Sequence, residues 1–234
     1  MSKPLLLDVN HLQTSFFTDK SEVKAVDDVS FQLYRGETVG IVGESGSGKS
    51  VTSLSIMRLI PSPGKVLGGE VTYHPIEGEA VNLRRLPRKT MRRYRGKELA
   101  MIFQEPMSSL NPVDRCGKQV AEAMRHHLGL SAKVAKARVL ELFERVQLPQ
   151  PERIYKAYPH QLSGGQKQRV MIAMAMSCQP GILIADEPTT ALDVTVQKTI
   201  LDLMNKLKEE MGSSILFITH DLGVIAEIAD RVLV

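Results

Sequence analysis

The sequence predicts an α/β protein in which a mostly parallel sheet with flanking helices is joined to a small antiparallel sheet and a helical insertion. Three observations favour this fold class. Short apolar runs alternate with helical segments in the last third of the chain, short runs of alternating polarity fill the first third, and a glycine-rich segment follows a buried strand near residue 42. The length of 234 residues suits one α/β domain with an inserted subdomain.

The first third is expected to form the antiparallel sheet. Apolar and polar residues alternate there in four runs, over 5–9, 14–17, 30–33 and 70–73. A period of two places one face of each strand on the core. The run over 39–42 is apolar throughout, as expected of a strand that is buried on both faces.

Residues 84–158 are interpreted as a helical insertion, which leaves 1–83 and 159–234 as the expected α/β core. Apolar residues near helical spacing recur in the insertion, with lysines and arginines between them. The insertion opens with a basic cluster, which we interpret as a solvated face: Arg84, Arg85, Arg88, Lys89, Arg92, Arg93 and Arg95.

The last third is predicted to alternate strands with a helix. Apolar runs over 182–185 and 215–219 indicate buried strands, and an apolar stripe over 196–211 indicates a helix that Gly212 ends. Strands that alternate with helices form right-handed βαβ units, which require a parallel sheet.

Composition excludes several classes of protein. Hydrophobic residues make up 43% and charged residues 24%, as in soluble globular domains. Cys116 and Cys178 are too few for a disulfide scaffold or a cysteine-built metal site. The net charge of +4 is small, and 5% aromatic residues without tryptophan do not favour nucleic-acid binding. No apolar run is long enough to span a bilayer and no signal peptide is recognised, so we expect a cytoplasmic protein.

The glycine-rich segment matches the phosphate-loop pattern G-x-x-x-x-G-K-[ST]. Its residues are Gly43, Glu44, Ser45, Gly46, Ser47, Gly48, Lys49 and Ser50. The glycines allow backbone N–H groups to point at phosphate oxygens, and the start of the following helix adds partial positive charge. Lys49 is expected to contact the β- and γ-phosphates, and the Ser50 hydroxyl is expected to bind Mg²⁺.

Two carboxylates follow the predicted strand over 182–185. Asp186 and Glu187 therefore lie at the carboxyl end of a parallel strand, where ligands bind in such sheets. We expect Asp186 to support the Mg²⁺ shell and Glu187 to polarise the water that attacks the γ-phosphate. The alternative is that both residues merely end the strand and cap the next helix.

A second candidate anion site precedes the helix that runs to Met176. Ser163 stands at the N-cap position, followed by Gly164, Gly165 and Gln166. The glycines expose the N–H groups of the first turn. Alone, this pentapeptide (Leu162–Gln166) is typical of an ordinary helix cap.

Along the chain the phosphate loop comes first, Leu162–Gln166 second and the carboxylates Asp186 and Glu187 third. Motifs in this order resemble the nucleotide-binding domain of ATP-binding cassette (ABC) proteins, whose core is that of a P-loop NTPase. The resemblance covers residues 5–234 and implies binding and hydrolysis of ATP with Mg²⁺. It also implies that Ser163–Gln166 complete the ATP site of a second ATP-binding subunit, identical or different.

Further residues match the family at their expected places. Gln104 is similar to the Q-loop glutamine, which contacts Mg²⁺ and takes part in catalysis, and His220 resembles the switch histidine at the γ-phosphate. Asp193, in Ala191-Leu192-Asp193, resembles the D-loop. The adenine-stacking aromatic corresponds to Phe16 or Phe17, of which we take Phe17.

The segments over 25–31, 43–45, 102–112 and 158–162 resemble the ATPases of oligopeptide, dipeptide and nickel importers. The resemblance implies integral membrane permease partners, an extracytoplasmic substrate-binding protein that acts indirectly, and a place at the cytoplasmic face of the membrane. Members of this subfamily continue into a C-terminal regulatory region, which we expect this chain to lack. Two alternatives stay open, namely a non-transport ABC ATPase in DNA repair or translation and an exporter-type cassette.

Overall fold

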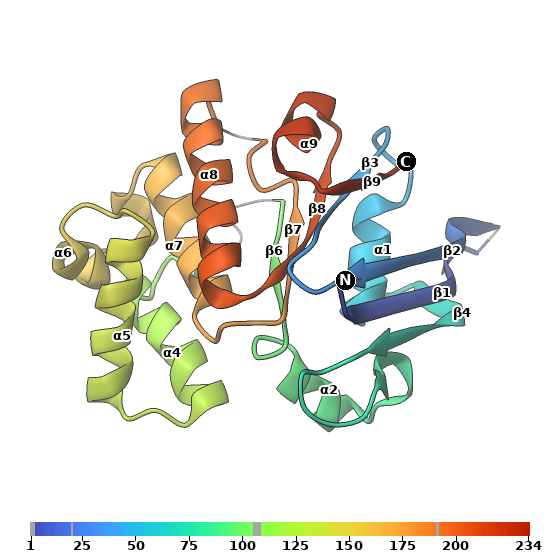
Figure 1. The fold of residues 1–234 in the computed structure, drawn as a ribbon, viewed down its shortest axis with the longest axis horizontal. Coiled ribbons are helices and arrows are strands. Elements are labelled where there is room, and N and C mark those ends of the chain that lie inside the picture. Colours follow the sequence, from blue (N-terminus) through green and yellow to red (C-terminus); the bar gives the residue numbers. More distant parts are fainter. Residues whose placement is uncertain (1–2, 20, 105–108, 191) are drawn as a thin grey trace. The chain divides into compact units, whose positions relative to one another are not determined.

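The computed structural model describes residues 3–19, 21–104, 109–190 and 192–234 (Figure 1). The chain folds as two compact units, the first comprising Met1–Arg95 with Ser214–Val234 and the second comprising Gly96–Ser213. Each unit has its own strands, helices and buried core. Within the described ranges, no helix is both long enough and apolar enough to cross a bilayer.

The first unit contains a four-stranded antiparallel sheet in the order β2-β1-β4-β5. Its strands are β1 (Leu5–Phe17), β2 (Glu22–Tyr34), β4 (Gly64–Tyr73) and β5 (Val81–Asn82). The antiparallel sheet is as predicted. The prediction of two separate strands over 5–9 and 14–17 is wrong, because both ranges belong to the single strand β1. Register shifts between residues 9 and 15, with His11 at a φ of 50°, keep the chain in the sheet without a turn.

Strand β1 supports the helix that follows the phosphate loop. Leu7, Val9 and Leu12 are fully buried in the sheet. Farther along the strand, the Thr14 hydroxyl lies 2.8 Å from the Ser55 hydroxyl of α1 (Lys49–Ile56). Both groups are buried, so their hydrogen bond removes the cost of leaving either one unpaired.

Three parallel strands of the first unit precede or flank the predicted phosphate loop. β3 (Thr38–Val42) pairs with β8 (Ser214–Thr219) on one side and with β9 (Arg231–Leu233) on the other. Val42 is paired with Thr219, so the residues that follow β3 and β8 leave the sheet at the same edge. Helix α9 (Leu222–Ile228) contacts β3.

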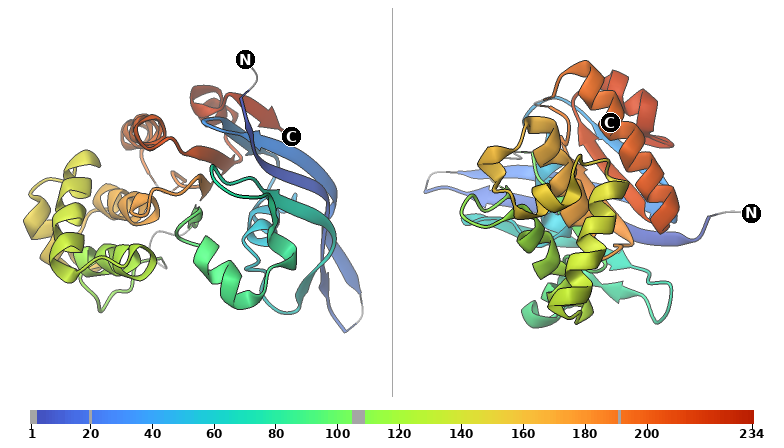
Figure 2. Two further views of the ribbon diagram at one scale, coloured as in Figure 1. Left: turned by 60° about the horizontal axis from the view of Figure 1, so that its bottom comes forward. Right: turned by 90° about the vertical axis from the view of Figure 1, so that its left-hand side faces the viewer.

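The second unit combines two parallel strands with a group of helices. β6 (Leu99–Ile102) pairs with β7 (Ile182–Asp186). Its helices are α4 (Cys116–Leu128), α5 (Ala132–Arg145), α6 (Pro151–Lys156), α7 (Gly164–Met176) and α8 (Val194–Met211). Helices α4, α5 and α6 contact one another, and α4 and α5 also contact α7 (Figure 2). The predicted helix over 196–211 is confirmed as α8, which ends at Gly212 with a φ of 66°.

The basic cluster lies in the first unit. It extends from the short turn η1 (Leu83–Arg85), which contacts β4, through α2 (Arg88–Tyr94) to Arg95. The boundaries between the two compact units lie at other residues than the expected boundaries between the core and the helical insertion. The insertion over 84–158 therefore stays a prediction.

Candidate functional site

The predicted phosphate loop connects β3 to α1. The Lys49 ammonium donates hydrogen bonds to the carbonyl oxygens of Gly43 at 2.8 Å and Glu44 at 2.7 Å. These bonds hold the positive charge against the curled backbone of the loop. Lys49 is 8% exposed, so the ammonium lies in surroundings where an anion contributes more than it would in bulk water.

Two glycines of the loop adopt conformations that other residues rarely reach. Gly46 has a φ of 85° and Gly48, the N-cap of α1, has a φ of 94°. At Gly48 a Cβ atom would also overlap the carbonyl oxygen of Ala25, whereas a Cβ atom at Gly46 would meet nothing within 4 Å. Gly48 is therefore required both for its backbone conformation and for the close approach of β2.

The same edge of the sheet carries His220. This histidine directly follows β8 and is exposed, and its neighbour Asp221 caps α9 by accepting a hydrogen bond of 2.8 Å from the Gly223 N–H. Since Val42 and Thr219 are paired, the loop and His220 start from adjacent strand ends. The first unit thus presents an ammonium, loop N–H groups and an imidazole at one edge.

The carboxylates predicted after residue 185 belong to the second unit. Asp186 is the last residue of β7 and is 5% exposed. Glu187 follows it with a φ of 47°, which is uncommon for a residue with a side chain. Strained backbone of this kind is concentrated at functional sites.

Hydrogen bonds from neighbouring side chains hold the Glu187 carboxylate. Gln104 Nε2 donates to Glu187 Oε2 at 3.0 Å, and the Thr190 hydroxyl donates to the same oxygen at 3.1 Å. The strand register explains the first contact: Ile102 of β6 is paired with Ala185 of β7, and Gln104 and Glu187 each stand two residues farther on. The structure therefore brings together two residues that the sequence analysis singled out separately.

Thr190 was not foreseen as a site residue. Its N–H and its hydroxyl also approach the carbonyl oxygen of Glu187, at 3.4 and 3.3 Å. A hydroxyl three residues after a candidate carboxylate is the signal that could have found it, because a tight turn brings such residues together.

The helix start predicted at Ser163 has the expected cap. The Ser163 hydroxyl accepts from the Gln166 N–H at 3.3 Å, and the Gln166 amide oxygen accepts from the Ser163 N–H at 3.1 Å. This reciprocal capping box leaves the N–H groups of Gly164 and Gly165 at the beginning of α7. A Cβ atom at Gly164 would meet nothing within 4 Å, so the first turn is open at this residue, whereas a Cβ atom at Gly165 would lie 3.2 Å from Val196.

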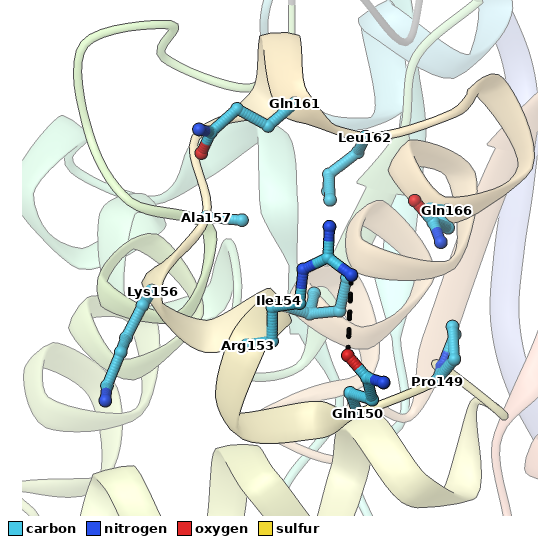
Figure 3. Close-up of a pocket in the computed structure, with 9 residues that line it drawn as sticks. All are labelled: Pro149, Gln150, Arg153, Ile154, Lys156, Ala157, Gln161, Leu162 and Gln166. Atoms are coloured by element: carbon cyan, nitrogen blue, oxygen red, sulfur yellow. Dashed lines mark hydrogen bonds between the residues drawn. The ribbon is translucent and has the colours of Figure 1, made fainter.

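A hollow of about 380 Å³ adjoins this cap (Figure 3). It is lined by Pro149, Gln150, Arg153, Ile154, Lys156, Ala157, Gln161, Leu162 and Gln166. Arg153 donates to the Gln150 side-chain oxygen at 3.4 Å within it. Of the predicted site residues, Gln166 alone lines this hollow.

The remaining predicted residues lie at element ends. Asp193 caps α8 by accepting from the Val196 N–H at 3.0 Å, while Ala191 lies outside the described residues. Phe17 ends β1 with 37% of its surface exposed, and the Lys65 ammonium lies 5.7 Å from its ring centroid. Phe16 lies against Gly64 of β4. Within the segment over 102–112, residues 105–108 also lie outside the described part.

The family model of the ABC transporter matches residues 26–190, most of the chain. A protein of Brucella ovis named as a peptide import ATP-binding protein is 52% identical over 235 aligned residues, which cover 100% of this chain and 70% of that protein. The chain belongs to the ABC transporter family. The glutathione import ATP-binding protein of Salmonella typhimurium is 53% identical to this chain. The alignment covers 98% of this chain and 37% of the Salmonella protein.

Solved structures support the same assignment. The ATP-binding cassette MJ0796, in a dimeric post-hydrolysis state bound to ADP and phosphate, superposes with a TM-score of 0.84 and 29% identity. The superposition covers 97% of this chain and 93% of that one. The cassette is thus an ABC ATPase domain with a P-loop NTPase fold, and the resemblance inferred from the motifs is confirmed.

Proposed function

We propose that this cassette binds and hydrolyses ATP to energise a membrane importer of di- or oligopeptides. The observation that carries the hydrolytic part is the Glu187 carboxylate, held at the end of β7 by Gln104 and Thr190. The transport part is supported by the names of the Brucella and Salmonella relatives, which describe peptide import and glutathione import.

Phosphate binding is assigned to residues 43–50. The Lys49 ammonium, which donates to the loop carbonyls, would exchange those bonds for oxygens of the β- and γ-phosphates. Charge-assisted hydrogen bonds to phosphate are stronger than bonds to neutral carbonyls, so this exchange is favourable. Phe17 is the proposed adenine-stacking residue because its ring is the more exposed of the two candidates at the end of β1.

The side chains of Ser50, Gln104 and Asp186 fit Mg²⁺ by the chemistry of their donors. They offer a hydroxyl, an amide oxygen and a carboxylate, which are the hard oxygen ligands this ion prefers. When bound, Mg²⁺ would neutralise charge on the phosphate oxygens. A site with few protein ligands is expected for Mg²⁺, which commonly shares its coordination with substrate phosphates and water.

The hydrolytic step is assigned to Glu187. Its carboxylate, oriented by the Gln104 amide and the Thr190 hydroxyl, would accept a hydrogen bond from the attacking water and polarise it. His220 would stabilise the γ-phosphate from the edge of the first unit. Gln104 also links the carboxylate to the segment that follows β6, so movement of that segment would alter the orientation of Glu187.

A second ATP-binding subunit is expected to complete each site. The open first turn of α7, at Ser163–Gln166, would face the γ-phosphate held by the partner, and Asp193 would lie at the same interface. The dimeric cassette structures that superpose on this chain support this arrangement.

Permease subunits would contact the segment over 104–112 and hold the cassette at the cytoplasmic face of the membrane, with an extracytoplasmic binding protein delivering the cargo. In this arrangement 1–83 and 159–234 form the ATP-binding core and 84–158 the helical insertion.

The proposed hydrolysis is tested with purified protein. Lys49→Ala is expected to weaken ATP binding by at least about tenfold, since it removes charge-assisted hydrogen bonds. Glu187→Gln is expected to retain ATP binding and lose Mg²⁺-dependent turnover. Unchanged ATP affinity in Lys49→Ala, measured by calorimetry, would overturn the phosphate assignment.

The transport role is tested by affinity purification from detergent-solubilised membranes of the source cells. Stable recovery of integral membrane proteins supports an importer. Recovery of DNA or ribosomes without them would instead favour a non-transport ATPase. Changes confined to residues 109–112 should uncouple transport and leave ATP affinity unchanged.

A further inference from the structure

A cavity in the first unit lies outside the residues assigned to nucleotide. Its volume is about 340 Å³, and it is lined by Arg58, Leu59, Ile60, Arg88, Met91 and Arg95. The walls come from the segment after α1 and from α2, labelled in Figure 1. Three arginines therefore border one cavity whose other lining residues are apolar.

The charge around this cavity is unbalanced. Residues 80–97 contain six arginines and two lysines but no aspartate or glutamate. At one end of the basic cluster, Arg85 forms an ion pair of 2.6 Å with Glu70. For the three arginines that line the cavity, the described residues provide no carboxylate within ion-pair distance.

Backbone carbonyls hold two of these arginines in place. Arg58 Nη1 donates to the carbonyl oxygens of Leu83 at 3.0 Å and Leu86 at 2.5 Å. Arg95 Nε and Nη2 donate to the carbonyl oxygens of Met57 and Arg58, each at 2.7 Å. Neutral carbonyls fix the position of a guanidinium group but do not neutralise its charge. The cations are thus arranged before any anion binds.

The electrostatics favour an added negative charge. Burial lowers the pKa of Arg95, and the positive charges of Arg58, Arg88 and Arg92 lower it further. An anion in the cavity would reduce the repulsion between these guanidinium groups. The same positive charges would therefore attract the anion.

We propose that the cavity binds a phosphate group through Arg58, Arg88 and Arg95. A phosphate carries up to two negative charges and several acceptor oxygens, which match several guanidinium forks better than one carboxylate does. Leu59, Ile60 and Met91 offer apolar contact for a substituent on the phosphate. A free phosphate compound and the headgroup of an anionic phospholipid share this chemistry.

Arg88→Glu is the test variant and Arg93→Glu is its matched control. Both residues are exposed on α2 and both changes alter the charge equally, but Arg93 does not line the cavity. A glutamate in the first turn of a helix is compatible with its dipole, so Arg88→Glu is expected to fold. Arg88→Lys keeps the charge but loses the guanidinium fork, so its binding should fall between those of wild type and Arg88→Glu.

The measurement has two arms, made on the full chain. Inorganic phosphate is titrated while the NMR signals of the arginine side chains are followed, and sedimentation is measured with phosphatidylcholine vesicles that contain or lack phosphatidic acid. We expect Arg88→Glu to weaken binding about tenfold in at least one arm, and Arg93→Glu to change it little. Dependence on Arg88 in the phosphate arm identifies a free phosphate compound as sufficient, and dependence in the vesicle arm alone identifies a lipid headgroup. Equal weakening by both substitutions, or no effect of Arg88→Glu in either arm, overturns the proposal.

Discussion

Glu187 combines a strained backbone with a side chain that two neighbours hold. Its φ of 47° carries a conformational cost of about 1–3 kcal/mol for a residue with a side chain. The surrounding turn maintains it, because the Thr190 N–H donates to the Glu187 carbonyl and the Thr190 hydroxyl donates to the Glu187 carboxylate. The turn therefore restrains the position of the carboxylate at the end of β7.

Thr190→Val is expected to lower ATP turnover about fivefold, which corresponds to the loss of one hydrogen bond worth about 1 kcal/mol. ATP affinity should be unchanged, since Thr190 orients the carboxylate and is not assigned a contact with phosphate. Thr190→Ser should restore turnover. Thr199→Val is the control, because the Thr199 hydroxyl donates to a carbonyl of its own helix at 2.9 Å, within exposed α8 surface. Steady-state kinetics showing equal losses in both valine variants would contradict this role of Thr190.

Gly48→Ala is expected to destabilise the protein more than Gly46→Ala does. Both positions have a positive φ, so each alanine should cost about 1 kcal/mol of unfolding free energy through backbone strain. Only at position 48 would the new Cβ atom overlap the carbonyl oxygen of Ala25. Thermal unfolding measures the stability of the two variants, and ATP titration measures their nucleotide binding. The difference in stability between the two variants reports the overlap, because both carry the backbone strain. Equal stability of the two would mean that β2 can move away from the loop.

Sequence patterns locate a candidate residue well where its local structure depends on a few consecutive residues. The loop over 43–50, the Ser163 cap and the carboxylates after residue 185 could all be located by spacing, because each depends on a few consecutive residues. Thr190 and the bond between Gln104 and Glu187 depend on how a turn and two strands are aligned. That alignment cannot be predicted from the sequence alone.

At the scale of elements, the register of β6 and β7 explains the contact between Gln104 and Glu187. Parallel pairing of Ile102 with Ala185 places the next residues of both strands side by side. The apolar run over 182–185 predicts β7 but not its alignment with a neighbouring strand, because apolar runs buried on both faces fit several registers equally well. The sequence also does not show that 5–9 and 14–17 form one strand, because the bulge that joins them in β1 has no distinct composition.

Helix α4 provides a pH-dependent test of packing in the second unit. Cys116 begins this helix, and its N–H donates to the Ala157 carbonyl at 2.9 Å. Burial raises the pKa of the Cys116 thiol from 9.0 to about 11. A raised pKa means that the neutral thiol favours the folded state, so its contribution to stability is complete below pH 9 and is lost as the pH rises towards 11.

The unfolding free energy should therefore fall less between pH 9 and 11 in Cys116→Ala than in the unchanged protein. Urea unfolding at several pH values measures this difference, and taking the change within each protein cancels the cavity that the alanine leaves. Identical pH dependence of the two proteins would show that the thiol ionises as easily when folded as when unfolded.

At the scale of the whole molecule, the proposed site divides between two copies. One cassette would supply the loop over 43–50 and Glu187, and its mate would supply the helix start at Ser163. ATP would then join the subunits, because its γ-phosphate is held from both sides. ADP lacks that group and should not support the closed dimer.

Two variants separate this interface from a general loss of helix capping. In the Glu187→Gln background, Ser163→Arg places a bulky side chain at the proposed phosphate-facing turn and should prevent dimerisation. Ser131→Arg makes the same change at the N-cap of α5, where Ser131 accepts from Val134 at 3.4 Å. The Ser131 variant should still dimerise with ATP if the α7 turn acts specifically.

The most direct measurement is the mass of Glu187→Gln by light scattering with saturating ATP and Mg²⁺, and then with ADP. This variant keeps the shape of the site and lacks the carboxylate that polarises water, so bound ATP should persist. The predicted result is a dimer with ATP and a monomer with ADP. A mass that is the same with both nucleotides would contradict the two-subunit ATP site.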